Sequence, residues 1–140
     1  MRRALTLLAV LVLGAGCRSG AGGPPPITTD MSCTHCGMNT QDLRVACEAR
    51  DASGSWRAYD SIECLIAHGD ARDPLAAYLA DYDTRGLHRA DSLWVVHGDF
   101  ATPMGGGYAA FLSREDATAL AADTRGSVAR LGVAAAGTRR

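Results

Sequence analysis

The sequence predicts an α+β protein made of two similar small ββαβ units, placed after a signal peptide and a flexible linker. Three observations predict this fold class. Short segments rich in β-branched and aromatic residues occur in pairs, each pair is followed by a helix-start signature, and the two sets of segments resemble each other. A length of 140 residues limits the chain to one compact unit or two very small ones.

The internal repeat is carried by two short alignments. Residues 56–63 align with residues 108–115, where aromatic, alanine, aromatic, serine and glutamate recur at matching positions. The preceding stretches 43–46 and 93–96 also match. We therefore expect a first half over residues 30–82 and a second half over residues 83–125.

The first half is predicted to contain two strands and two helical segments. Residues 43–48 and 55–59 have the composition of strands, and a glycine-containing turn separates them. Asp60 and Glu63 form a helix-start signature of the capping-box kind. The apolar side chains of this helix that we expect in the core are Ile62, Leu65 and Ile66. Residues 75–82 are expected to be helical, because Pro74 suits the first turn of a helix.

The second half is predicted to follow the same order. Strands are expected over 93–97 and 107–111, and Ser113 with Asp116 marks the start of a helix. The core side of this helix would carry Ala117, Leu120 and Ala121. Residues 126–140 are rich in alanine, glycine and arginine, so we expect a frayed helix or a disordered tail there.

The N-terminus predicts export and lipid anchoring. Met1–Gly16 contains two arginines, a short apolar run and small residues before Cys17, as in a lipoprotein signal peptide. The apolar run is shorter than the ~20 residues that cross a bilayer. Residues 17–29, rich in glycine and proline, are expected to be a flexible tether from lipidated Cys17. The alternative is a cleaved secreted protein with a free cysteine.

Composition excludes some functions. The formal net charge is −1, so no excess of basic residues predicts binding to nucleic acid. The sequence also contains no recognisable Ser/His/Asp arrangement or paired catalytic carboxylates. A non-enzymatic binding protein outside the cytoplasm is therefore expected.

The chemistry of the chain is concentrated in residues 30–38, DMSCTHCGM. A C-x-x-C turn brings the sulfurs of Cys33 and Cys36 close enough to share a metal ion. Met38 favours Cu(I) over zinc, since Cu(I) accepts thiolate and thioether ligands together. Met104 lies in the segment TPMGGG, which is too rich in glycine to be a core position. The sequence therefore predicts a soft-metal site in which Met104 takes part.

Two other classes of protein remain open. A structural zinc module would use Cys33, Cys36 and two further ligands chosen from Cys47, Cys64, His68 and His97. A thiol-disulfide oxidoreductase would use Cys33 and Cys36 as a redox pair, but the motif precedes a predicted strand instead of opening a helix.

Three segments together resemble the NosL family of nitrous oxide reductase accessory lipoproteins. They are the C-x-x-C-G-M motif of residues 33–38, the segment YDSIEC of residues 59–64, and TPMGGGYAAF of residues 102–111. The similarity covers nearly all of residues 30–123. It implies a fold of two similar ββαβ units and a Cu(I) chaperone for the copper sulfide centre of nitrous oxide reductase.

The resemblance also implies partners and site residues. The partners would be an ABC-type membrane complex and periplasmic accessory proteins, reached from a lipid anchor on the periplasmic side of the outer membrane. Cys36 and Met38 match the copper-binding Cys-Gly-Met of the family, and Met104 matches the methionine of its glycine-rich block. Cys33 would have a supporting role. His35 is a less expected ligand, and the alternative is an exposed loop histidine.

The remaining cysteines and histidines have simpler interpretations. We expect Cys47 to be a buried, inert thiol. Cys64 is a further candidate ligand that could reach the C-x-x-C turn, and a Cys47–Cys64 disulfide is also possible. His68, His88 and His97 are expected to be ordinary surface histidines.

Overall fold

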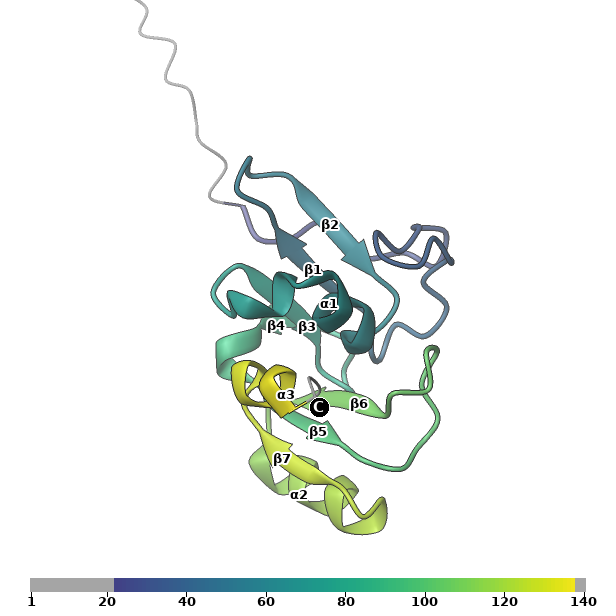
Figure 1. Cartoon of the computed structure of the whole chain (residues 1–140), viewed down its shortest axis with the longest axis vertical. Helices are drawn as coiled ribbons and strands as arrows, with labels where there is room; N and C mark the ends of the chain where they lie inside the picture. The colour runs from purple at the N-terminus through teal and green to yellow at the C-terminus, as the bar shows by residue number, and fades with distance from the viewer. Residues whose placement is uncertain (1–21, 138–140) are drawn as a thin grey trace, which may run out of the picture.

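Two small antiparallel sheets stand one above the other in the computed structural model, which describes residues 22–137 (Figure 1). The predicted signal peptide and Cys17 lie outside the described residues. Within residues 22–137, no helix is both long enough and apolar enough to cross a bilayer.

The first sheet has four strands: β1 (Cys47–Arg50), β2 (Trp56–Tyr59), β3 (Ala77–Ala80) and β4 (Leu87–Arg89). Their order is β2-β1-β3-β4, and all neighbours are antiparallel. Gly54, at a φ of 87°, closes the turn between β1 and β2, where other residues would be strained. Helix α1 (Ile62–His68) and the short 3-10 helix η1 (Asp70–Arg72) connect β2 to β3.

The second sheet has three strands: β5 (Trp94–His97), β6 (Tyr108–Phe111) and β7 (Ser127–Ala129), in the order β6-β5-β7. The 3-10 helix η2 (Ala90–Ser92) leads into it, helix α2 (Arg114–Asp123) connects β6 to β7, and α3 (Leu131–Gly137) follows. Each half therefore contains a hairpin, a helix, and a later strand that pairs with the first strand of the hairpin.

Residues 75–82, where we expected a helix, contain the strand β3 and no helix. Ala77 and Leu79 are fully buried, and β3 is hydrogen-bonded between β1 and β4. So short a helix is marginal on its own. Pairing on both edges and burial of alternate side chains therefore outweigh the local helical preference.

The observed elements differ from the expected ones in three further places. Strand β4 pairs with β3, so the first sheet extends beyond residue 82. Residues 126–137 are also ordered: β7 pairs with β5, and Leu131 of α3 is fully buried. The pairing with β5 orders β7, and the buried leucine holds α3 in place. Strand β1 begins at Cys47, later than the expected residue 43.

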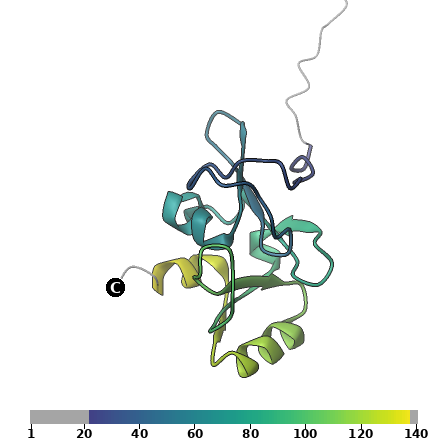
Figure 2. The same cartoon turned by 90° about the vertical axis from the view of Figure 1, so that its right-hand side faces the viewer.

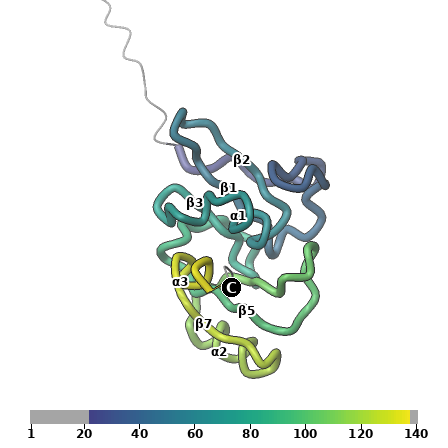
Figure 3. The backbone as a smooth tube through the Cα atoms, viewed as in Figure 1, coloured from purple at the N-terminus to yellow at the C-terminus, as the bar shows by residue number. Residues whose placement is uncertain are grey.

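The main core spans both halves. It contains Tyr59, Ile62 and Leu79 from the first half together with Leu93 and Leu131 from the second. Helix α3 lies between the halves, where it contacts η1 and β5 (Figure 3). The expected core positions Ile62 and Leu65 are buried, and Ile66 is half-buried. In α2, Ala117 and Ala121 are buried and Leu120 is half-buried.

Part of the predicted tether lies against the first sheet. Residues 22–28 contain no helix or strand. Pro24 and Ile27 line a hollow of about 330 Å³, together with Leu43 and Leu87.

Candidate metal centre

Four side chains converge where the C-x-x-C loop meets the start of α1. The ligand atoms of Cys33, Cys36, Asp60 and Cys64 all lie within 4.8 Å of one another. Cys33, Asp60 and Cys64 are buried, and Cys36 is half-buried. We call these four residues the thiol cluster. It is a compact set of three sulfurs and one carboxylate with one partly exposed member.

The C-x-x-C loop folds back on itself. Ser32 and Asn39 form an isolated antiparallel bridge, the Cys33 amide donates to the Met38 carbonyl at 2.8 Å, and the Gly37 amide donates to the Cys33 carbonyl at 2.9 Å. Gly37 has a φ of 77°, a conformation that a residue with a Cβ adopts only with strain. Glycine at this position therefore lets the loop close and bring Cys33 and Cys36 together.

Backbone contacts fix this loop to the first sheet. The Thr34 amide donates to the Ala58 carbonyl at 2.8 Å, so the loop lies beside the end of β2. The Thr40 amide and hydroxyl both donate to the Met31 carbonyl. The two cysteines are thus held against the point where β2 runs into α1.

The helix start supplies the other two members of the cluster. Ser61 is the N-cap of α1, and its hydroxyl accepts from the Cys64 amide at 3.4 Å. We had expected Asp60 to be the cap. Because Ser61 takes that role, the Asp60 carboxylate is available to the thiols. Cys64 lies one turn into the helix and is 1% exposed.

Burial dominates the electrostatics of the thiols. Desolvation raises the pKa of Cys36, and it also raises the pKa of Cys64. The Cys36 thiol donates to Asp60 Oδ2 at 3.6 Å. Asp60 Oδ1 is buried and has no hydrogen-bond partner among the described residues. A buried carboxylate oxygen without a partner is costly, and a cation bound at the cluster would compensate it.

The two predicted thioether ligands lie outside the thiol cluster. Met38, two residues after Cys36, is 49% exposed, and Met104 is 44% exposed. The loop between β5 and β6, which carries Met104, lies on the same side of the molecule as the C-x-x-C loop (Figures 1 and 2). Both methionines are therefore available at the surface.

A partly buried contact fastens the Met104 loop to α1. Glu63 Oε1 accepts hydrogen bonds from the Thr102 hydroxyl and from the Gly106 amide, the latter at 3.0 Å. The Gly107 amide donates in turn to the Thr102 hydroxyl at 3.0 Å. Glu63 immediately precedes Cys64, so the contact joins this loop to the helical turn that carries the cluster.

Other predicted candidates are not members of the thiol cluster. His35 is exposed, and its ring centroid is 6.1 Å from that of His68. His68 and His97 line a cavity of about 560 Å³ with Met104. Cys47 is fully buried, and its thiol donates to the Ser61 carbonyl at 3.3 Å. Burial raises the pKa of this thiol further, as expected for an inert cysteine.

All four cysteines within residues 22–137 are free thiols. The possible Cys47–Cys64 disulfide is therefore not formed. Cys64 joins Cys33 and Cys36 in the cluster, whereas Asp60 was missed as a site residue because its position before a helix had suggested a cap. Asp60 precedes the N-cap Ser61 and lies outside α1, so helical spacing does not signal its place beside Cys64.

Comparison with known proteins agrees with this architecture. The sequence pattern of the NosL family matches residues 24–133, which include all four members of the thiol cluster and Met104. The chain belongs to the NosL family. No curated protein matches the sequence significantly.

A solved NosL structure shares the fold. The crystal structure of the copper chaperone NosL from Shewanella denitrificans superposes with a TM-score of 0.65 and 19% sequence identity. The match covers 77% of this chain and 92% of that chain. The arrangement of two antiparallel sheets is thus a NosL-like fold.

Proposed function

We propose that this NosL-family protein binds Cu(I) and carries it to a copper enzyme. The observation that supports the proposal most is the thiol cluster, three cysteine sulfurs and one carboxylate within 4.8 Å of one another beside an exposed methionine loop. Thiolate and thioether ligands favour Cu(I) among biological metals. Membership of the family and the fold shared with a copper chaperone support the same assignment.

Cys36 is the central ligand in this proposal. It is the half-buried member of the cluster, and it lies two residues before the exposed Met38. Met38 and Met104 supply thioether ligands, and Cys33 has a supporting role. Cys64 and His35 are further candidates to complete the coordination. Two sulfurs that bind one ion through bonds of ~2.3 Å lie at most ~4.6 Å apart. The ligand atoms of the cluster lie within 4.8 Å of one another, so small side-chain movements would bring them to metal-binding distances.

Copper would move by ligand exchange. Cu(I) is content with two or three ligands, so a donor from the acceptor protein can bind before a ligand of this protein leaves. The exposed methionines are where such a donor can approach. The family resemblance favours nitrous oxide reductase as the recipient, assisted by an ABC-type membrane complex and periplasmic accessory proteins.

The site of action proposed for the protein is the periplasmic face of a membrane. The sequence of residues 1–17 supports a signal peptide followed by lipidation at Cys17. Outside the cytoplasm, free thiols tend to oxidise. Bound copper would protect the thiol cluster from pairing into a disulfide.

We also propose that the two halves derive from one duplicated ββαβ unit. The support is their shared order of hairpin, helix and returning strand, with equivalent strand neighbours in both sheets. The aligned segments 56–59 and 108–111 are β2 and β6, the second strand of each hairpin.

A structural zinc site is the second candidate, because the thiol cluster offers four donors and three of them are buried. Zinc bound in this way needs neither methionine. The two functions therefore differ in their dependence on Met38 and Met104.

Anaerobic metal titration separates these functions. The reduced protein without residues 1–19 is titrated with Cu(I) and separately with zinc against competing chelators, alongside Met38→Ala, Met104→Ala and the control Met31→Ala. We expect tight Cu(I) binding, weakened by about tenfold or more in the first two variants, since changes around a metal alter affinity by about 10–100-fold. Met31→Ala should leave it unchanged. Tight zinc binding with an affinity that is the same in all three methionine variants would contradict the copper proposal and support the structural zinc site.

A further inference from the structure

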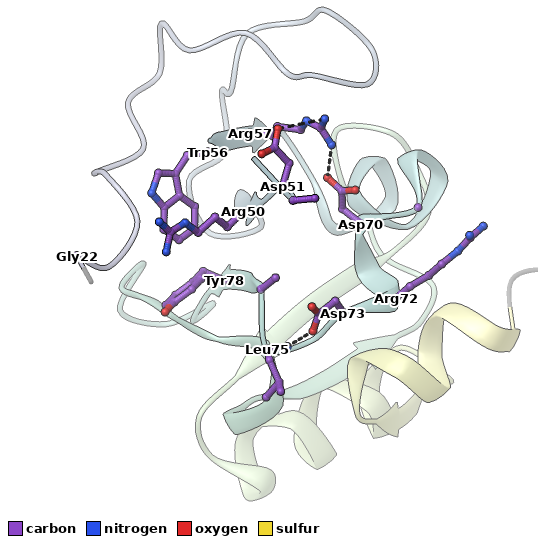
Figure 4. Close-up of a pocket in the computed structure, with 13 residues that line it drawn as sticks. Gly22, Arg50, Asp51, Trp56, Arg57, Asp70, Arg72, Asp73, Leu75 and Tyr78 are labelled. Atoms are coloured by element: carbon purple, nitrogen blue, oxygen red, sulfur yellow. Dashed lines mark hydrogen bonds and ion pairs between the residues drawn. The ribbon is translucent and has the colours of Figure 1, made fainter. Parts of the chain in front are cut away.

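A second surface feature, a cleft that contains no residue of the thiol cluster, suggests a membrane contact. We propose that this cleft rests on the headgroup region of the membrane to which the chain is anchored. It has a volume of about 720 Å³ and is formed by the β1–β2 hairpin, η1 and the start of β3 (Figure 4). The inference rests on the proposed lipid anchor.

The cleft has aromatic and aliphatic walls. The rings of Trp56 and Tyr78 meet edge to face with centroids 5.5 Å apart, and both residues are half-buried. Leu75 is 63% exposed at its lower rim (Figure 4). Tryptophan and tyrosine prefer the boundary between lipid chains and water, where one end of the side chain is apolar and the other is wet.

Arginine supplies the charge. The Arg50 guanidinium lies 5.8 Å from the centroid of the Trp56 ring, and Arg72 is exposed at the other side of the cleft (Figure 4). Neither forms an ion pair with another residue in the range 22–137. Arginine can lay its aliphatic stem along apolar surface and direct its guanidinium to phosphate.

The acidic residues of the cleft are already engaged. Arg57 forms ion pairs with Asp51 and with Asp70, each at 3.3 Å. Asp70 Oδ2 also accepts from the Tyr59 hydroxyl at 2.5 Å, and Asp73 Oδ1 accepts from the Leu75 amide at 3.0 Å. The formal charges of the three arginines and three aspartates that line the cleft cancel. Arg50 donates through Nε to the Gly54 carbonyl at 3.1 Å, and within residues 22–137 neither Arg50 nor Arg72 has an acidic partner, so both guanidinium groups can still bind a lipid phosphate.

The course of the chain brings the cleft to the membrane. Gly22, the first described residue, lines it next to Trp56 and Arg50 (Figure 4). Cys17 precedes Gly22 by five residues, so the two are at most ~18 Å apart even in a fully extended chain. The loops of the candidate metal centre lie on the opposite side of the molecule in Figure 1. Docking through the cleft would leave them accessible to a partner protein.

The two tryptophans of the chain allow a direct test. Trp56 lines the cleft, whereas Trp94 lies in β5, with the guanidinium carbons of Arg130 and Arg114 at 3.7 and 4.9 Å from its ring centroid. Trp94→Phe leaves Trp56 as the only tryptophan, and Trp56→Phe leaves Trp94. Each full-length protein, purified from membranes, is placed in phosphatidylethanolamine–phosphatidylglycerol vesicles with bromine near the headgroup end of the acyl chains.

We expect brominated lipid to quench the emission of Trp56 and to leave that of Trp94 unchanged. Leu75→Ser should reduce the quenching of Trp56, and Leu112→Ser, at a residue 46% exposed after β6, should not. If the protein is acylated and both tryptophans are quenched equally, or neither is quenched, the proposed docking is wrong but the lipid anchor stands. If the protein carries no acyl group, both the lipid anchor and the docking are wrong. The Cu(I) titration is independent of either outcome.

Discussion

At the scale of single residues, the burial of Glu48 in the first sheet lowers the stability of the folded protein. It lies in the middle of β1, opposite Ala58 and Tyr78, and is fully buried. Neither carboxylate oxygen has a hydrogen-bond partner within the described residues. Desolvation raises the pKa of this carboxyl group from 4.5 to about 7.

This shift makes stability depend on pH. The folded state holds the proton more tightly than the unfolded state. The pH-dependent destabilisation by Glu48 is therefore absent below pH ~4.5 and grows as pH rises to ~7. Glu48→Gln should gain stability relative to the parent protein between pH 5 and pH 8, by up to about 3 kcal/mol at ~1.36 kcal/mol per pKa unit. Urea unfolding of reduced protein at both pH values measures this. The exposed control Glu115→Gln should show no such gain, and a pH-independent difference for Glu48→Gln would contradict the argument.

The site residues show what a sequence can predict at this scale. Cys33 and Cys36 were predictable members of the thiol cluster because the motif is local and its spacing fixes a turn. Asp60 was not, because Asp60 and Ser61 are both good N-cap residues at adjacent positions. The choice between them depends on how β2 enters α1, and that depends on burial of Tyr59 and Ile62 in a core assembled from distant segments.

At the scale of elements, the first turn of α1 connects the two halves of the candidate site. Glu63 holds the Met104 loop through Thr102 and Gly106, and Cys64 belongs to the thiol cluster. Glu63→Ala should free the loop and, if Met104 is a ligand, weaken Cu(I) binding by about tenfold, as loss of a supporting contact does at other metal sites. Chelator competition measures the affinity, and hydrogen exchange should quicken over residues 102–107.

A double variant checks the cause of this effect. Adding Glu63→Ala to Met104→Ala should weaken binding no further than Met104→Ala alone, because both act through one ligand. Glu115→Ala, in the first turn of α2, serves as the control. Additive losses would show that Glu63 acts on the metal by some route other than Met104.

Strand β3 marks the limit of prediction for elements. The sequence of residues 75–82 is compatible with a short helix, and no local pattern within it predicts a strand. Its state is decided by the unpaired edges of β1 and β4, since buried backbone groups must find partners. The hairpins and the helices after them were predictable because turn and cap signals are local.

At the scale of the whole molecule, the two halves share one core and should unfold together. Tyr59 and Leu79 belong to the same buried cluster as Leu93 and Leu131, although the sequence divides the chain into two similar units. Fluorescence of Trp56 and Trp94, one in each half, should therefore report coincident urea transitions.

Helix α3 stabilises this shared core, which gives the C-terminal segment a role that its composition did not suggest. Leu131 is fully buried against residues of both halves, while Val133 on the same helix is 68% exposed. Leu131→Ala should lower the free energy of unfolding by about 2–5 kcal/mol, because it leaves a cavity that the core fills only in part. Val133→Ala should change it by about 0.5 kcal/mol at most. Urea unfolding of the reduced proteins compares them, and equal small losses would mean that α3 is dispensable for joining the two halves.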